Sequence, residues 1–418
     1  MNKICVIGLG YIGLPTCAVL ALSGYQVVGV DINKEVIKTI NRGEIHIGEP
    51  NLNQIIKDMV SKKRIIAKMN PEKADAFMID VPTPLREDKT CDLSYVISAV
   101  NSIIPYLNKG NLVIIESTIP PNTTEEVIRP IIEKAGFNVG IDVYLAHCPE
   151  RVLPTKIMEE IIFNNRIIGG YTSTCAEKAE EIYINFVKGK ILKTDIKTAE
   201  MSKVVENVFR DVNIALSNEL AKICDRLNVD VHKVIELANN HPRVNVHHPG
   251  PGVGGHCIAV DPHFIIKKCP DLAKIISLAR DINNSMPSYV VSKVNQLLDG
   301  IKSPKIAVWG ITYKGNIDDV RESPALDIIN LLKENHYIVT IYDPYVNNKN
   351  IEILSINDSV KDADMILILT DHDIFRELNY YKFIKNMRTP IVFDTKNIIN
   401  TDDYDSQYIK VVNFGNLH

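Results

Sequence analysis

The first thirty residues constrain the fold more than any other part of the chain. Residues 4–30 carry no charged side chain, and five glycines interrupt them before the stretch ends in Asp31. Length alone would allow a signal peptide or a membrane span, but so many glycines together with Pro15 are unusual in a lipid-facing helix. The stretch divides instead into a β-rich hexamer (Lys3–Gly8), a small-residue helix and a second β-rich segment (Tyr25–Val30). We therefore predict a buried strand–helix–strand unit and no membrane partner.

The glycines of this unit have the spacing of a dinucleotide-binding turn. The run Gly8-Leu9-Gly10-Tyr11-Ile12-Gly13 stands directly after the first predicted strand and opens the predicted helix. Gly8 permits the tight turn, Gly10 lets backbone approach a pyrophosphate, and Gly13 allows close helix–strand packing. The amino terminus of the helix attracts the phosphate charge. A glycine-rich turn without a ligand is the alternative.

Asp31 ends the second predicted strand, in position to accept hydrogen bonds from the ribose of an adenosine. A carboxylate at this point repels a 2′-phosphate. The expected cofactor is therefore NAD rather than NADP.

Polar clusters follow three later predicted strands. They are Val81–Pro84, Glu116–Thr118 and His147–Arg151. Ligands of such sheets collect beyond the carboxyl ends of the strands, so we expect the three clusters to form one rim over a nicotinamide. Taken separately, each polar residue could instead be a helix cap or a loop residue.

Strand and helix patterns alternate at both ends of the chain. The predicted strands are Lys3–Gly8, Gln26–Val30, Ala76–Val81, Leu112–Glu116, Val143–Ala146 and Arg166–Gly169, then Lys305–Gly310, Ile338–Tyr342, Met365–Thr370 and Ile391–Asp394. Short apolar runs of this kind are typical of parallel sheets covered on both faces. We predict an α/β protein with two Rossmann-like doubly wound parallel sheets joined by a central helical domain. The predicted domains are 1–195, 196–300 and 301–418.

The central region begins with one long helix. No Gly or Pro interrupts Thr198–Leu227, and apolar residues recur there at mostly three- and four-residue spacing. The predicted helix is roughly 45 Å long at 1.5 Å per residue. Because one small domain cannot cover such a helix, we expect it to join two domains and to offer a face to a second subunit, in a homodimer or higher oligomer.

Charge and cysteine usage exclude some classes of function. The net charge is −4, which gives no global electrostatic case for nucleic acid as a partner. None of the eight cysteines forms a CxxC pair, so neither a zinc ribbon nor a thioredoxin-type motif is present. Scattered cysteines of this kind predict reduced thiols and a cytoplasmic location.

The densest cluster of chemistry-bearing residues lies between His241 and Pro262. Cys257 follows the run Gly252-Val-Gly-Gly-His and precedes Asp261 by four residues. Backbone N–H groups of a glycine run can face an anion, and a thiolate needs such a setting to be reactive. A buried structural cysteine is the alternative. The nearby histidines also suggest a metal, but they show no recognised ligand spacing, so none is expected.

Two further sets of polar residues could complete such a site. Lys203 and Asn207 lie four residues apart on the long helix and could polarise a carbonyl and stabilise an oxyanion. In the last domain, Lys314 and Arg321 could bind the phosphates or ribose of a nucleotide sugar. The alternatives are solvated helix positions for the first pair and ordinary salt bridges to neighbouring aspartates for the second.

Together these motifs resemble the family of UDP-glucose and GDP-mannose dehydrogenases. The resemblance covers essentially the whole chain and rests on Gly8–Pro15, Val81–Pro84, Ser117–Thr118, Pro149–Glu150, Ala199–Asn207, Gly252–Asp261 and Tyr313–Ser323. It implies a four-electron oxidation of a sugar C6 alcohol to a carboxylate with two NAD. Three segments are similar to the branch that oxidises UDP-N-acetyl-D-mannosamine: Cys148–Leu153, His241–Val246 and Pro249–Pro262.

The resemblance also implies roles for single residues. Cys257 would attack the aldehyde, Lys203 and Asn207 would hold the oxyanion, and Glu150 or Asp261 would orient the hydrolytic water. Beside the glycines, Tyr11, Ile12, Asp31, Thr83 and Thr118 look like NAD contacts. The residues that look like UDP-sugar contacts are Arg151, Val152, Lys203, Asn207, Arg210, Gly254, Tyr313, Lys314 and Arg321. His241 and Arg243 look like further sugar contacts, which a neighbouring subunit could supply.

Two positions depart from the UDP-glucose branch. Pro154 replaces a second Glu, and Ala259-Val260 replace Pro-Lys before the residue that matches Asp261. We therefore expect little activity on UDP-glucose. UDP-N-acetylglucosamine and, more weakly, UDP-N-acetylgalactosamine are alternative substrates. A two-electron β-hydroxyacid-type dehydrogenase and a nucleotide-sensing protein without catalysis are alternative functions.

Overall fold

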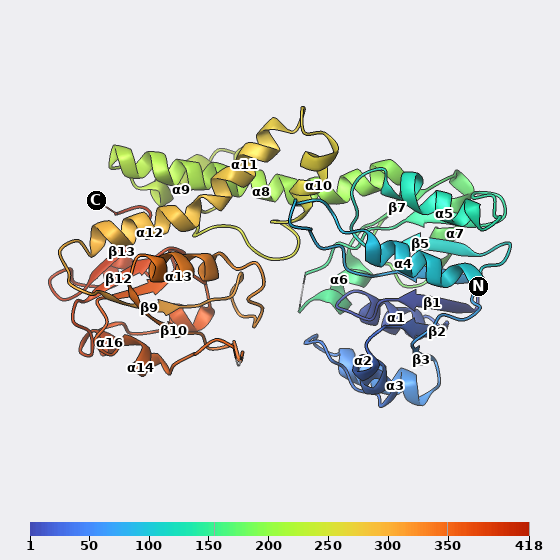
Figure 1. The fold of residues 1–418 in the computed structure, drawn as a ribbon, viewed down its shortest axis with the longest axis horizontal. Helices are drawn as coiled ribbons and strands as arrows, with labels where there is room; N and C mark the ends of the chain where they lie inside the picture. The colour runs from blue at the N-terminus through green and yellow to red at the C-terminus, as the bar shows by residue number, and fades with distance from the viewer. Residues whose placement is uncertain (154, 349, 418) are drawn as a thin grey trace. The chain divides into compact units, whose positions relative to one another are not determined.

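The structure is a computed structural model that describes residues 1–153, 155–348 and 350–417. Pro154, the first departure from the UDP-glucose branch, lies outside the described residues. By their contacts the residues group into two compact units. The first holds Met1–Glu206 and His263–Cys269, and the second holds Asn207–Pro262 and the chain from Pro270 onward (Figure 1). The predicted domain limits near 195 and 300 stay a prediction.

An eight-stranded sheet forms the centre of the first unit. Its order is β3-β2-β1-β4-β5-β6-β7-β8. The strands are β1 (Lys3–Ile7), β2 (Gln26–Val30), β3 (Ile65–Lys68), β4 (Ala76–Ile79), β5 (Leu112–Ile115), β6 (Tyr144–His147), β7 (Arg166–Gly170) and β8 (Ile191–Asp195). The chain order reverses between β1 and β4, which is where ligands bind in sheets of this type.

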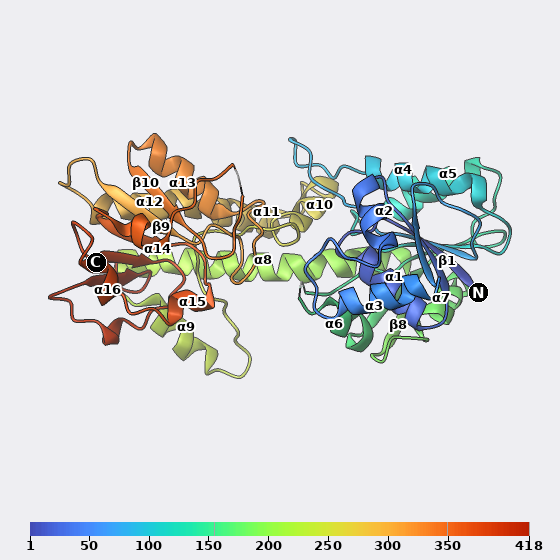
Figure 2. The same ribbon diagram turned by 90° about the horizontal axis from the view of Figure 1, so that it is seen from below.

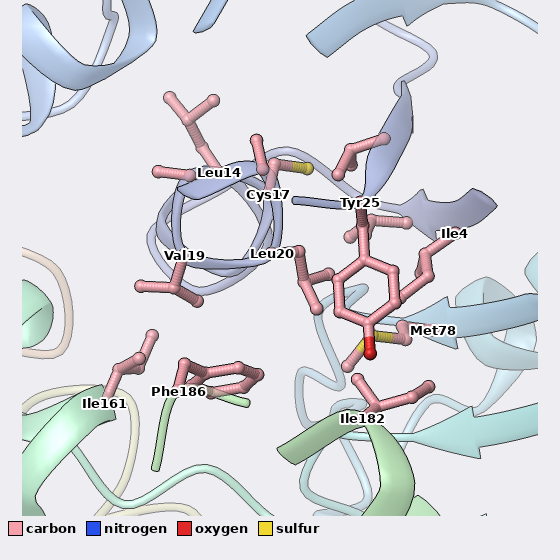
Figure 3. Packing of buried hydrophobic residues seen from close by; sticks show 14 of the residues in the cluster. Ile4, Leu14, Cys17, Val19, Leu20, Tyr25, Met78, Ile161, Ile182 and Phe186 are labelled. Atoms are coloured by element: carbon pink, nitrogen blue, oxygen red, sulfur yellow. The ribbon is translucent and has the colours of Figure 1, made fainter. Parts of the chain in front are cut away.

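Helices cover both faces of this sheet. Successive side chains of β1 point to opposite faces and therefore pack against different helices. Ile4 and Val6 belong to the same buried cluster as Leu14 and Leu20 of α1. Figure 3 shows Ile4 of this cluster beside Tyr25 and Met78. Cys5 and Ile7 face the opposite layer. One layer contains α1 (Gly13–Leu22), α2 (Lys34–Asn41), α3 (Leu52–Ser61), α6 (Ile157–Phe163) and α7 (Ser173–Tyr183), and the other α4 (Ser94–Ile103), η1 (Ile104–Tyr106), η2 (Thr124–Ile128) and α5 (Arg129–Lys134).

The prediction of a wholly parallel first sheet is wrong at one pair. β6 and β7 run antiparallel, with Ala146 opposite Gly170 and His147 opposite Gly169. The chain leaves β6 at its carboxyl end and enters β7 from that same edge, so this connection needs no crossover. As a consequence Arg166, the first residue of β7, lies beside the polar clusters that follow the carboxyl ends of β5 and β6.

A second, five-stranded sheet forms the centre of the second unit. It is parallel throughout, in the order β10-β9-β11-β12-β13. The strands are β9 (Lys305–Trp309), β10 (Ile338–Tyr342), β11 (Met365–Ile368), β12 (Ile391–Asp394) and β13 (Lys410–Asn413). The short elements between them are α13 (Pro324–Glu334), α14 (Ile356–Val360), α15 (Asp373–Arg376), α16 (Tyr381–Ile384) and η3 (Thr401–Asp403).

The part of the sequence between β8 and β9 is helical, as predicted. Its helices are α8 (Ile196–Leu227), α9 (Val231–Asn239), α10 (Asp261–Lys268), α11 (Lys274–Asn284) and α12 (Met286–Leu297). Figure 2 shows α8 as one unbroken helix, which begins two residues before the predicted start. Among the described residues, no helix is long and apolar enough to cross a membrane.

Candidate active site

The glycine turn after β1 has the steric pattern of a phosphate cradle. A Cβ added to Gly8, whose φ is +98°, would lie 2.5 Å from the carbonyl oxygen of Asp80. A Cβ on Gly13 would lie 1.8 Å from the oxygen of Gly8, so neither position can hold a side chain. A Cβ on Gly10, by contrast, would meet no protein atom within 4 Å. Gly10 therefore leaves open space at the start of α1, where a pyrophosphate is attracted by the helix amino terminus.

Asp31 lies beside this turn at the end of β2. Its Oδ2 accepts a hydrogen bond from the backbone N–H of Leu9 at 3.0 Å, and its Oδ1 accepts one from Asn33 at 2.8 Å. The two bonds fix the carboxylate next to the turn while the side chain stays partly exposed. The turn, the helix and Asp31 together fit NAD, and the negative charge at Asp31 disfavours a 2′-phosphate.

Two of the three polar clusters meet at the ends of β4 and β5. The Thr83 hydroxyl donates to the backbone oxygen of Thr118 at 2.6 Å. The Ser117 hydroxyl donates to the oxygen of Val81 at 2.7 Å. The two predicted NAD contacts in this rim, Thr83 and Thr118, are thus neighbours. Tyr11 is exposed and Ile12 partly exposed at the start of α1.

The third cluster is joined to the second through a buried arginine. Arg166 Nη1 lies 2.6 Å from Glu150 Oε2, and Arg166 Nη2 lies 3.3 Å from Glu116 Oε1. The Tyr183 hydroxyl donates to the same Glu116 oxygen at 2.6 Å. Burial alone would lower the pKa of Arg166, but Glu150 and its other anionic neighbours hold that pKa above its usual value. Arg166 therefore stays charged and neutralises part of this buried carboxylate cluster.

Asp80 adds a further buried carboxyl group behind the glycine turn. Burial raises its pKa well above the ordinary value, and the neighbouring Glu116 raises it further. Burial likewise raises the pKa of Glu116, against the lowering effect of Arg166. Both effects favour the protonated form of Asp80, which limits the negative charge that Arg166 must balance.

Glu200, near the start of α8, fixes the loop that follows Thr118. Its carboxyl oxygens accept from the backbone N–H groups of Asn122 at 2.6 Å and Thr124 at 2.8 Å. Burial raises its pKa to about 7, although these hydrogen bonds lower it. In the sequence, Glu200 is one acidic residue of a predicted amphipathic helix, and no pattern there indicated that it binds the loop after Thr118.

The raised pKa of Glu200 predicts a pH-dependent stability. Between its unfolded pKa of 4.5 and its folded pKa of about 7 the folded state binds the proton more tightly, so the free energy of unfolding falls as pH rises. We expect Glu200→Gln to remove about 3 kcal/mol of this fall between pH 4.5 and pH 8. Urea unfolding at several pH values measures it. The control is Glu35→Gln, since hydrogen bonding to Lys38 lowers the pKa of exposed Glu35 and gives the opposite sign. Parallel pH curves for wild type and Glu200→Gln would contradict the assignment.

In the second unit the glycine loop packs against the segment that follows β9. A Cβ on Gly254 would lie 2.2 Å from the oxygen of Glu322, and a Cβ on Gly255 would lie 2.7 Å from the ring of Tyr313. The His256 ring lies edge-on to Tyr313, with centroids 6.5 Å apart. The structure thus brings the predicted catalytic loop together with the predicted sugar contacts Gly254 and Tyr313.

Cys257 lies in the turn that leads into α10, and its side chain is exposed. The Cys257 carbonyl accepts from the N–H of Asp261 at 2.9 Å. The Asp261 side chain, 3% exposed, accepts from the Asn207 Nδ2 at 2.6 Å. The turn therefore presents the thiol outward while its last residue is bound to α8. This disfavours the alternative of a buried structural cysteine.

The remaining predicted residues divide between the two units. In the first, Lys203 is partly buried, Val152 is partly buried, and Arg151 Nη1 lies 2.6 Å from Glu206 Oε1. In the second, Arg321 pairs with Asp319 at 2.8 Å, the salt bridge that the sequence left as an alternative. The exposed positions in this unit are Arg210, His241, Arg243 and Lys314.

Within the described ranges, no group of three or more His, Cys, Asp or Glu side chains is arranged to hold a metal ion. The histidines around Cys257 instead contact other groups. His256 Nε2 lies 3.5 Å from Asp319 Oδ2, and the His247 ring lies edge-on to Phe209 at 6.4 Å.

Comparison with known proteins identifies relatives along the whole chain. Residues 2–187, 197–285 and 307–401 match the NAD binding, central and UDP binding domains of the UDP-glucose/GDP-mannose dehydrogenase family. A UDP-N-acetyl-D-mannosamine dehydrogenase of Methanococcus maripaludis is 48% identical, over 100% of this chain and 97% of its own. An NDP-N-acetyl-D-galactosaminuronic acid dehydrogenase of Ralstonia solanacearum is 43% identical, over 94% and 96%. The native structure of the UDP-N-acetyl-mannosamine dehydrogenase of Staphylococcus aureus is 48% identical, over 100% and 99%, with a TM-score of 0.91.

Proposed function

The chain belongs to the UDP-glucose/GDP-mannose dehydrogenase family, and from this premise we propose that it oxidises the C6 alcohol of UDP-N-acetyl-D-mannosamine to the carboxylate. The product is UDP-N-acetyl-D-mannosaminuronate. Conversion of an alcohol to a carboxylate removes four electrons, so two NAD molecules each accept a hydride and one water is consumed. The observation that carries the proposal is the turn at Cys257, which presents a thiol between a packed glycine loop and the bonded pair Asn207–Asp261.

Cys257 supplies the covalent step. Its thiolate forms a bond to the carbon of the aldehyde that the first oxidation produces, and the carbonyl oxygen becomes an oxyanion. Loss of hydride from this thiohemiacetal leaves a thioester. Water then adds, the C–S bond breaks, and the carboxylate and the thiolate are released. The covalent link keeps the reactive aldehyde on the protein between the two oxidations.

Asn207 is suited to hold the oxyanion. Its amide nitrogen has two N–H groups, and one of them donates to Asp261 Oδ2 at 2.6 Å. That bond fixes the amide plane and leaves the second N–H to donate to a developing negative charge. Lys203, one helical turn earlier on α8, supplies the positive charge of the same step.

Glu150 orients the hydrolytic water. Its Oε1 accepts from the backbone N–H of Arg151 at 2.7 Å, and its Oε2 is paired with Arg166. Both oxygens are therefore held in place, and each oxygen keeps a second lone pair with which to accept a hydrogen bond from water.

The substrate assignment is tested by turnover of a panel of UDP-sugars with NAD. We expect two NADH for each UDP-N-acetyl-D-mannosamine consumed, and a kcat/KM for UDP-glucose at least about a hundredfold lower. Comparable turnover of the two sugars would overturn the substrate. UDP-N-acetylglucosamine and UDP-N-acetylgalactosamine belong in the panel, the latter because of the Ralstonia relative. One NADH per sugar would instead indicate a two-electron dehydrogenase, and NAD binding without any turnover would indicate a nucleotide sensor.

We also propose that the protein acts in the cytoplasm as a homodimer or higher oligomer. A reducing compartment keeps the nucleophilic thiol reduced. The support for association is an exposed apolar stripe on α8, whose members recur at four- and seven-residue spacing: Met201, Val205, Phe209, Leu216, Ile223 and Leu227. Sedimentation at several protein concentrations measures the mass, and a monomer at all of them would contradict this proposal.

A further inference from the structure

The loop that carries Cys257 is bonded at both ends to one face of α8. At its start, the backbone N–H of Gly250 donates to Asn218 Oδ1 at 2.9 Å. At its end, Asn207 Nδ2 donates to Asp261 Oδ2 at 2.6 Å. Asn207 and Asn218 lie eleven residues apart, or about three turns, and therefore share a helix face. All four residues belong to the second unit.

A chain of buried side chains fixes Asn218 in turn. Asn218 Nδ2 donates to Asn283 Oδ1 at 2.9 Å, and Asn283 Nδ2 donates to Asp211 Oδ1 at 2.8 Å. Arg280 Nη1 donates to the same Asp211 oxygen at 2.6 Å. These four side chains are at most 4% exposed. Both polar atoms of each asparagine amide are bonded, and because buried polar groups are mostly paired, the contacts of Asn218 and Asn283 are strongly specified.

The direction of every bond in this chain is determined from its two ends. Gly250 N–H can only donate, so Asn218 must turn its oxygen toward the loop and its nitrogen toward Asn283. A backbone carbonyl can only accept, and Asn283 Nδ2 donates to that of Asp211 at 3.0 Å, so Asn283 must turn its nitrogen toward Asp211. Neither amide can flip without setting two acceptors or two donors against each other.

We infer that Asn218 and Asn283 are positioning residues that set where the turn at Cys257 stands relative to Asn207. Asp211 and Arg280 anchor the chain at its far end. The middle of the loop packs on Tyr313 and Pro324 rather than on α8. The bonds at Gly250 and Asp261 are therefore the two points at which the loop is attached to α8. The inference rests on the proposed role of Cys257 as the nucleophile.

The test is the isosteric change Asn218→Asp. The carboxylate keeps the bond to Gly250 but sets an acceptor against Asn283 Oδ1, so the chain is broken at constant volume. We expect kcat to fall about 10- to 100-fold, with the KM for NAD unchanged, as for other residues that orient a reacting group. Because a displaced thiol captures aldehyde less well, we also expect more than two NADH per acid formed, with aldehyde recovered as a hydrazone.

Two substitutions provide matched controls. The first is Asn213→Asp: Asn213 lies on the same helix, but its side chain donates to the backbone oxygen of Phe209 and not to Asn283 or the loop. The second is Asn284→Asp, which keeps the side-chain oxygen that accepts from Arg280. Both should retain wild-type kcat and two NADH per acid. If Asn218→Asp does the same while its thermal midpoint falls, the chain is only structural and the inference is wrong. Should Asn218→Asp fail to fold, the milder Asn218→Ser is measured in the same way.

A substrate-independent measurement separates this inference from the proposed function. Iodoacetamide alkylation of Cys257 is followed by peptide mass, with exposed Cys269 in the same chain as the internal reference. We expect Asn218→Asp to raise the Cys257 rate relative to Cys269 by at least about threefold, because a detached loop samples more open conformations. An unchanged ratio would overturn the inference even if the protein oxidises UDP-sugars. A raised ratio would support it even if the substrate proposed above is wrong.

Discussion

Cys257→Ser should abolish net formation of the sugar acid. Serine is a far weaker nucleophile than a thiolate at neutral pH, so the aldehyde is not captured and the second oxidation has no covalent intermediate to act on. We expect the rate of acid formation to fall at least about a thousandfold, or about 4 kcal/mol of transition-state stabilisation. A slow first oxidation can persist, because the glycine turn at Gly8–Gly13 and Asp31 are untouched. Acid formation is followed by chromatography and NADH by absorbance.

Cys269→Ser is the matched control for this experiment. Cys269 is also exposed, but it lies just after α10 and has no part in the proposed chemistry. Its variant should keep the wild-type rate. Wild-type acid formation by Cys257→Ser would disprove the covalent mechanism, whereas equal losses in both variants would point to a general effect of thiol removal on the protein.

The fold was predictable where apolar runs are buried on both faces of a sheet. β2, β10 and β12 have the predicted limits, and the other predicted strands differ by one or two residues at one end or, for β6, at both ends. The strands that were missed are β3, β8 and β13, all at sheet edges. An edge strand needs little apolar sequence, and β8 accordingly reads Ile-Leu-Lys-Thr-Asp with no buried residue. Only the three-dimensional pairing identifies such a segment.

The candidate site was predictable where spacing alone constrains chemistry, as in the glycine turn and the Cys257 loop. What the sequence did not show is how buried polar residues pair over long separations. Glu116 and Arg166 are 50 residues apart, and Asn218 and Asn283 are 65 apart. One signal was available. Asn207, Asp211 and Asn218 recur at four- and seven-residue spacing on α8, so three polar residues share a face that apolar neighbours also occupy.

Arg166→Met should destabilise the first unit more than any other single charge removal discussed above. Arg166 is 4% exposed and is the cation between Glu116 and Glu150, whose side chains are also buried. Methionine fills the space but leaves two carboxylates without a countercharge. We expect the free energy of unfolding to fall by about 3–5 kcal/mol at pH 8, measured by urea unfolding. Arg42→Met is the control, because Arg42 and Glu44 form an exposed pair at 2.8 Å and should contribute less than about 1 kcal/mol.

The pH dependence of this loss distinguishes an electrostatic role from a packing role. Burial raises the pKa of Glu116 and Arg166 lowers it, so removal of the arginine raises that pKa further. The folded variant then binds a proton that the unfolded chain releases, and its stability falls as pH rises. The deficit relative to wild type should therefore be smaller at pH 5 than at pH 8. An equal deficit at both pH values would assign Arg166 to packing alone. A deficit no larger than that of Arg42→Met would contradict its role as the buried countercharge that holds Glu150 at the site.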